Sequence, residues 1–287
     1  MTQSNNPLRQ FFRQPAIYIK LPSDGANWTA GSLDMPQNHE IPVYPMTAID
    51  EITYRTPDAL FNGQAVINVI HSCIPAIKNA WHMPNIDINT VLIAIRIASH
   101  GHELEIESTC PACTESAEYA MDLRSVLDKI ATPDYNKMLD HGDLQIVFAP
   151  LSYEMQNHHS QKQFEQQQML NSITRSELSE EEKLARINAA MGEITKLTLE
   201  VLSASIAGIK TPDTFVDDQD MITEFLNNCD RLMFNAIRDQ IIDLRKDSDL
   251  QPVHLKCNSC SHEYDQPLNL DMTSFFEPAS WSRPLNR

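Results

Sequence analysis

Glycine and basic residues are scarce in this 287-residue sequence, which has seven glycines and 22 Lys and Arg residues against 39 Asp and Glu. So few glycines leave no glycine-rich phosphate loop or dinucleotide fingerprint, and we find no nucleophile elbow and no HExxH helix. An active site built from scattered residues would leave no such motif. We nevertheless expect a protein that is not an enzyme, and we assign no catalytic residue and no small-molecule substrate.

The formal net charge of −17 makes the average surface potential repel phosphate backbones and anionic lipid. No stretch approaches the roughly 20 apolar residues that span a bilayer, and residues 1–13 contain no apolar signal-peptide region. We therefore expect a soluble, unsecreted chain that binds neither nucleic acid nor membrane. Its 42% apolar residues are enough for an ordinary buried core.

Four of the six cysteines form two C-x-x-C pairs, Cys110 with Cys113 and Cys257 with Cys260. A C-x-x-C turn lets two thiolates approach one metal ion, so two turns supply the four ligands of a tetrahedral zinc site. A Cys₄ site leaves no open position for water or substrate, so the zinc ion would be structural. The sequence thus predicts a structural Zn²⁺ bound by these four cysteines.

Strand-like residues flank both pairs, at 102–107 and 118–123 around the first and at 253–256 and 263–270 around the second. A leucine, Leu123 or Leu270, stands ten positions after the second cysteine of each pair. The two parts read as a degenerate repeat of β-hairpins, and two facing hairpins make a zinc ribbon. Because 143 residues separate the pairs, this ribbon is split by an insertion.

Other interpretations of the cysteines are a redox C-x-x-C motif, which would open a helix, and disulfides, which the lack of a secretion signal disfavours. His262 could replace one cysteine as a ligand, although a role as an ordinary hairpin residue is preferred. Cys73 and Cys229 fall in helical patterns and are expected to be buried small apolar residues. Arg96 interrupts an apolar helix, and we expect it on an exposed face or paired with an acid rather than as a buried anchor.

The expected fold is α+β and mainly helical, with the split zinc ribbon interrupted by a helical insertion. Four segments are predicted: a β-like segment (1–44), a helical core with the first zinc hairpin (45–123), an inserted helical domain (124–250), and the second zinc hairpin with an aromatic tail (251–287). The predicted strands cover 16–21, 41–44 and 144–149. The predicted helices cover 47–54, a segment from 56, 63–73, 89–98, 124–139, 152–171, 179–207 and 221–246.

Two segments invite partner-binding interpretations. The helix over 152–171 is rich in glutamine and has little to anchor it, so it is expected to be solvated or held by another subunit, with His158 and His159 solvated. Phe275, Phe276 and Trp281 form an aromatic cluster after the second hairpin. These rings could dock in a neighbour, but we expect them to fold back on the core.

Four segments carry a family resemblance: Val43–Glu51, Thr56–Gly63, Asn89–Gly101 and Asn269–Phe276. The sequence resembles the baseplate hub proteins of contractile-tailed, T-even-like phages over roughly residues 40–125 and 215–280. The resemblance implies a virion protein of the hub or inner baseplate that binds other tail proteins. It also implies a location in the tail baseplate of the virion, after assembly in the host cytoplasm.

Two alternatives remain open at this point. The first is an assembly chaperone for the hub that is absent from the mature virion, which the resemblance does not separate from a structural subunit. The second is a zinc-ribbon nucleic-acid-binding protein. Glu105, Glu107, Glu115 and Glu118 around the first pair argue against it, and only Lys256 favours it.

Overall fold

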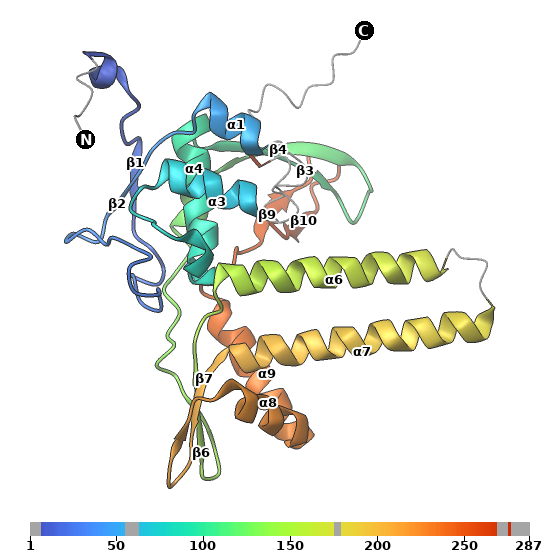
Figure 1. The fold of residues 1–287 in the computed structure, drawn as a ribbon. Helices are drawn as coiled ribbons and strands as arrows, with labels where there is room; N and C mark the ends of the chain where they lie inside the picture. Colours follow the sequence, from blue (N-terminus) through green and yellow to red (C-terminus); the bar gives the residue numbers. More distant parts are fainter. Residues whose placement is uncertain (1–6, 55–62, 175–178, 269–274, 277–287) are drawn as a thin grey trace.

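The computed structural model describes residues 7–54, 63–174, 179–268 and 275–276 (Figure 1). Helices and small antiparallel sheets confirm the predicted α+β class. Buried apolar side chains form two clusters, one built mainly from residues before the insertion and one within the insertion. The division into four segments stays a prediction, as does the helix starting at residue 56, which lies outside the described residues. None of the described helices has the length and apolar character needed to cross a membrane.

The first cluster surrounds helix α4 (Ile88–His100), the apolar helix predicted from the sequence. Eight of its thirteen residues are buried, and Gly101 ends it with a φ of 84° and an N–H bond to the Ile97 carbonyl. A positive φ at this position is open to glycine without strain. The surrounding elements are β1 (Ile17–Ile19), β2 (Ile41–Val43), α1 (Ala48–Tyr54), α3 (Gln64–Cys73), and the 3-10 helices η2 (Ala80–His82) and η3 (Asn85–Asp87).

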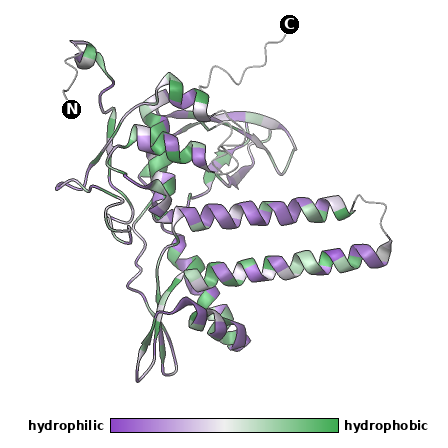
Figure 2. Cartoon of the chain, in the orientation of Figure 1, coloured by the Kyte–Doolittle hydropathy of each residue, from purple (hydrophilic) through white to green (hydrophobic). Residues whose placement is uncertain are grey.

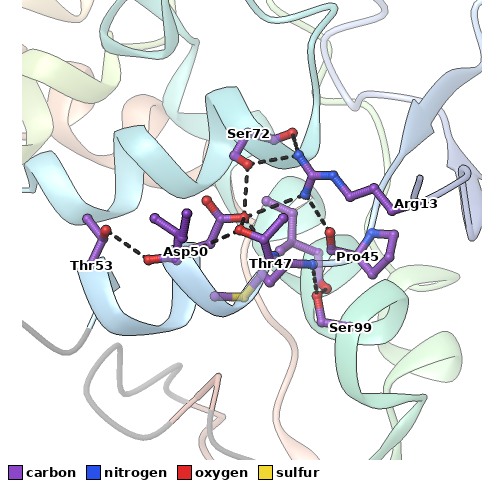
Figure 3. Close-up of polar contacts among 10 residues, drawn as sticks. Arg13, Pro45, Thr47, Asp50, Thr53, Ser72 and Ser99 are labelled. Carbon is purple, nitrogen blue, oxygen red and sulfur yellow. Dashed lines mark hydrogen bonds and ion pairs between the residues drawn. The ribbon is translucent and has the colours of Figure 1, made fainter. Parts of the chain in front are cut away.

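Arg13 fastens the N-terminal arm, which begins with the 3-10 helix η1 (Pro7–Phe11), to this core (Figure 3). Its guanidinium donates to the carbonyls of Pro45 and Ser72, both at 2.6 Å, and lies 3.5 Å from the Asp50 carboxylate. Asp50 also accepts from the Thr47 N–H, while its own N–H bonds the Thr47 hydroxyl. One carboxylate therefore caps α1 and orders the arm.

Arg96 is buried, with 1% of its surface exposed, so the predicted exposed or acid-paired position is wrong. Its Nε donates to the Phe275 carbonyl at 3.0 Å, and Nη1 lies 3.4 Å from the Gly101 carbonyl. Neutral backbone acceptors replace the expected acid because Phe275 and Phe276 pack against the cluster around α4. Phe275 and Phe276 are each 4% exposed, which confirms that they fold back on the core. Trp281 lies outside the described residues.

The insertion contains the strand predicted over 144–149 as part of a four-stranded antiparallel sheet in the order β5–β6–β7–β8, of which the other three strands were not predicted. The strands are β5 (Leu139–His141), β6 (Leu144–Phe148), β7 (Ile206–Lys210) and β8 (Phe215–Val216). The predicted helix over 124–139 is wrong beyond its first turn, since α5 spans only Leu123–Leu127 and Pro133 disfavours helix. Helix α7 (Glu180–Ala204) ends before 207, where β-branched residues enter β7 instead.

The single helix predicted over 221–246 is two helices, α8 (Gln219–Asn228) and α9 (Arg231–Arg245). The Asp230 carboxylate accepts from the Met233 N–H at 2.9 Å and starts a new helix. The break changes the predicted apolar face, so Leu232 is 76% exposed. Cys229 lies at the break instead of inside a helix, and it is half-buried. Cys73 is fully buried, as predicted.

Helices α6 (Tyr153–Thr174) and α7 form an antiparallel hairpin that projects from the body (Figure 1). Ser179 and Glu182 form a capping box at the start of α7, at the first residue of the predicted helix over 179–207. Much of α6 is hydrophilic, as Figure 2 shows. Leu184 and Met191 on α7 are 60% and 50% exposed, although their helical spacing is typical of a face that packs on a core. The hairpin thus buries one seam and leaves its other faces in solvent.

Asp87 holds the loop that follows β1 against the start of α4. It accepts from the Ser23 N–H at 2.8 Å, from the Ser23 hydroxyl at 2.5 Å and from the Trp28 indole N–H at 2.9 Å. Asp87 is fully buried, and burial raises the pKa of its carboxyl to about 6, although the three donors favour the ionised form.

We expect the substitution Ile93→Ala to destabilise the fold by about 2–5 kcal/mol, because it empties a fully buried site in α4. Ile52→Ala is the matched control, since Ile52 is 71% exposed on α1 and its loss should change stability by less than about 0.5 kcal/mol. Urea unfolding followed by circular dichroism measures both. Equal effects of the two substitutions would contradict the assigned core.

The raised pKa of Asp87 predicts a pH-dependent stability. Between its unfolded value of 3.8 and about 6, the folded protein takes up a proton that the unfolded chain does not, so Asp87 adds stability as pH falls through this window. Asp87→Asn cannot titrate. The free energy of unfolding of the wild type, minus that of Asp87→Asn, should therefore rise by on the order of 2 kcal/mol from pH 7 to pH 4. A constant or falling difference would refute the raised pKa.

Candidate metal centre

Both cysteine pairs lie at the turns of β-hairpins, as the sequence predicted. The first hairpin joins β3 (Glu103–Thr109) to β4 (Ser116–Asp122), and the second joins β9 (Val253–Lys256) to β10 (Glu263–Gln266). Both are antiparallel and in continuous register. Each turn therefore presents its two thiols from the end of a paired ribbon.

The two turns have the same backbone geometry. In the first, the Cys110 N–H donates to the Glu115 carbonyl and the Thr114 N–H donates to the Cys110 carbonyl, both at 2.9 Å. The same pair of bonds recurs at Cys257, at 2.8 and 2.9 Å, with Ser261 in the position of Thr114. Thr114 and Ser261 have φ values of 59° and 60°, which are rare for residues other than glycine. Strain of this kind concentrates at functional sites.

The four cysteine Sγ atoms converge on one point and lie within 4.8 Å of one another. The separation is 3.7 Å between Cys110 and Cys260 and 3.6 Å between Cys113 and Cys257. For tetrahedral zinc with Zn–S bonds of about 2.3 Å, the edge between two sulfurs is about 3.8 Å. Both short contacts join one hairpin to the other, so a single ion of this size fits between them.

The four thiols differ in burial and in pKa, and a hydrogen bond to the Cys260 thiol raises the pKa of Cys113 to about 12. Cys110 and Cys257 are 1% and 3% exposed, while Cys113 is half-buried and Cys260 faces solvent. The backbone N–H groups of Cys260 and Ser259 lower the pKa of the Cys257 thiol to about 6. The thiolate that results is the form that binds metal.

A polar contact that sequence reasoning missed joins the hairpins away from the thiols. The Ser108 hydroxyl lies 2.9 Å from the Tyr264 hydroxyl and donates to Gln266 Oε1 at 2.7 Å. A separate hydrogen bond between the side chains of Tyr119 and Tyr264 raises the pKa of Tyr119 to about 12. The alternation of exposed and buried positions along β3 places Ser108 on the inward face, which could have suggested a polar contact there. It does not reveal that the partner is 156 residues away.

The remaining candidate residues stand apart from this cluster. The four cysteines are the metal-ligating group found in the part of the chain that the structure describes. The His262 carbonyl accepts the turn hydrogen bond from Cys257, in keeping with an ordinary hairpin role. His158 is exposed as predicted, whereas His159 is half-buried, and burial lowers its pKa.

Comparison with protein families supplies the biological setting of this fold. Residues 32–277 match the family described as T4 bacteriophage base plate protein. The chain belongs to this family. No curated protein and no solved structure matches it.

The T4 baseplate family match covers most of the chain, including both hairpins and the insertion between them. Membership indicates a structural role in a phage baseplate, a location in the virion tail, and association with other tail proteins. It confirms the phage and baseplate part of the resemblance. The assignment to the hub is finer than the family description and stays a prediction.

Proposed function

We propose that this T4 baseplate family protein is a structural subunit of the hub or inner baseplate, in which one zinc ion holds the two hairpins together and other tail subunits bind the body. The observation that carries the proposal is the convergence of four thiols from two hairpins in a chain of a baseplate family. A closed Cys₄ site has no free coordination position for chemistry, which suits a structural role.

The zinc ion would fix the ends of the insertion. The chain leaves the first hairpin through β4 and returns through β9, and the Sγ atoms of Cys113 and Cys257 lie 3.6 Å apart. Binding energy at such a site is folding energy, because the unfolded chain does not hold the four thiols together. The projecting α6–α7 hairpin would thereby keep a defined direction relative to the first cluster.

Exposed apolar side chains support contacts with other subunits. Phe11 and Phe12 on the N-terminal arm are 76% and 55% exposed, and Ile49 and Ile52 on α1 are 74% and 71% exposed. Arg13 ties the arm to α1 through Asp50, so these side chains belong to neighbouring elements (Figure 3). Exposed apolar side chains mark interaction surfaces where they form a contiguous patch.

Electrostatics disfavours nucleic acid as a partner of the ribbon. Glu103, Glu105 and Glu107 are exposed on one face of β3, and Glu107 lies directly opposite Glu118 of β4. Like charges in cross-strand pairs repel each other and repel phosphate. This face therefore lacks the basic surface that a zinc-ribbon nucleic-acid-binding protein requires.

The zinc proposal predicts one equivalent of zinc per purified chain, measured by inductively coupled plasma mass spectrometry. Cys257→Ser should lower the zinc content severalfold and lower the thermal midpoint, because a thiolate ligand is lost. Cys229→Ser is the control, since Cys229 is outside the cluster, and it should keep full zinc content. Native protein without zinc, or unchanged zinc content in Cys257→Ser, would overturn the proposed site.

The structural role predicts a fixed, low number of copies in every purified virion, measured by quantitative mass spectrometry with labelled peptides of this chain. A known baseplate protein of the same particles supplies the copy-number standard. Absence from particles together with presence in infected cells would refute the structural role and identify an assembly factor.

A further inference from the structure

The free edge of β1 offers unpaired backbone groups. Tyr18 lies opposite Pro42 of β2, and proline has no N–H, so this pair cannot exchange hydrogen bonds. In an antiparallel ladder, the N–H and C=O of Tyr18 must then point away from β2. The β1–β2 sheet has two strands, and no described strand covers its other edge.

A hollow of about 300 Å³ adjoins this segment. Residues 18–22 line one part of it, residues 127–132 after α5 line another, and Thr90 of α4 contributes between them. A volume of about 300 Å³ is at the lower end of ligand pockets, so it suits a short stretch of polypeptide rather than a bulky cofactor.

Two charged side chains of opposite sign border the hollow. Lys20 and Asp128 are exposed along it, and neither forms an ion pair in the described part of the chain.

We propose that the hollow beside β1 binds an extended peptide segment of another tail subunit, which adds a strand to the free edge at Tyr18. Strand addition uses backbone hydrogen bonds for affinity and flanking pockets for side chains. The opposite charges of Lys20 and Asp128 disfavour a strongly anionic ligand and suit a peptide that carries both signs. That the peptide belongs to another tail subunit rests on the proposed function. That the free edge binds an extended peptide does not.

The test uses the full-length chain and overlapping 15-residue peptides from the other structural proteins of the same phage tail. Tyr18→Pro removes the outward N–H without removing a bond to β2, and Tyr18→Thr, which keeps that N–H, is its matched control. We expect a peptide that binds the wild type and Tyr18→Thr, and binds Tyr18→Pro about tenfold or more weakly. Hydrogen exchange should slow at residues 18–22 and 127–132 in the complex.

A second measurement keeps the test decisive if Tyr18→Pro does not fold. N-methylation of alternate peptide amides should abolish binding in one register only, because only alternate amides of an added strand bond the free edge. The proposal is overturned if no peptide binds, if protection appears elsewhere, or if a second copy of this chain occupies the edge instead. These outcomes are independent of virion copy number, so failure here and failure of the proposed structural role are distinguishable.

Discussion

The meeting of four thiols from two distant hairpins is the constraint on which the rest of the structure depends. Cys113 and Cys257 are 144 residues apart in sequence, yet their Sγ atoms lie 3.6 Å apart. The chain between them therefore forms one long loop whose two ends lie together. The entropy cost of closing a loop grows only with the logarithm of its length, so a long insertion costs little more than a short one. The Ser108 contacts and the proposed metal ion both offset that cost.

The second hairpin is held from two sides. At its turn it meets the first hairpin through the thiols, and beyond β10 the chain returns to α4, where Arg96 donates to the Phe275 carbonyl. Phe276 also packs edge-on against Tyr54 of α1, with ring centroids 4.8 Å apart. A buried guanidinium that bonds backbone carbonyls is costly unless the segment it binds stays in position. The position of Phe275 and Phe276 and the stability of the core around α4 therefore depend on each other.

The sequence predicted the features that depend on local chemistry. Two C-x-x-C turns, the apolar α4 with its glycine cap, and the Ser179 capping box each carry a short signal that the structure confirms. The missed features depend on partners distant in sequence. Strand β7 was not predicted, and its first two residues fall in the predicted helix over 179–207, because its partner strand β6 lies about 60 residues away. Arg96 was expected on an exposed face or beside an acid because its acceptor is 179 residues away. The break at Asp230 had a local signal, an N-cap carboxylate, which the longer apolar stripe obscured.

The positions where pattern and structure disagree also bear on assembly. Leu184, Met191 and Leu232 follow helical apolar spacing but are 60%, 50% and 76% exposed, and Ile49 and Ile52 are more than 70% exposed on a short helix. In a chain that acts alone, such residues would weaken solubility and add nothing to the core. In a baseplate protein, whose family works with other tail proteins, they are available to subunit contacts. Apolar spacing predicts burial correctly in the core and fails at these surface positions. This pattern fits a subunit whose exposed apolar side chains are buried by contacts with other chains.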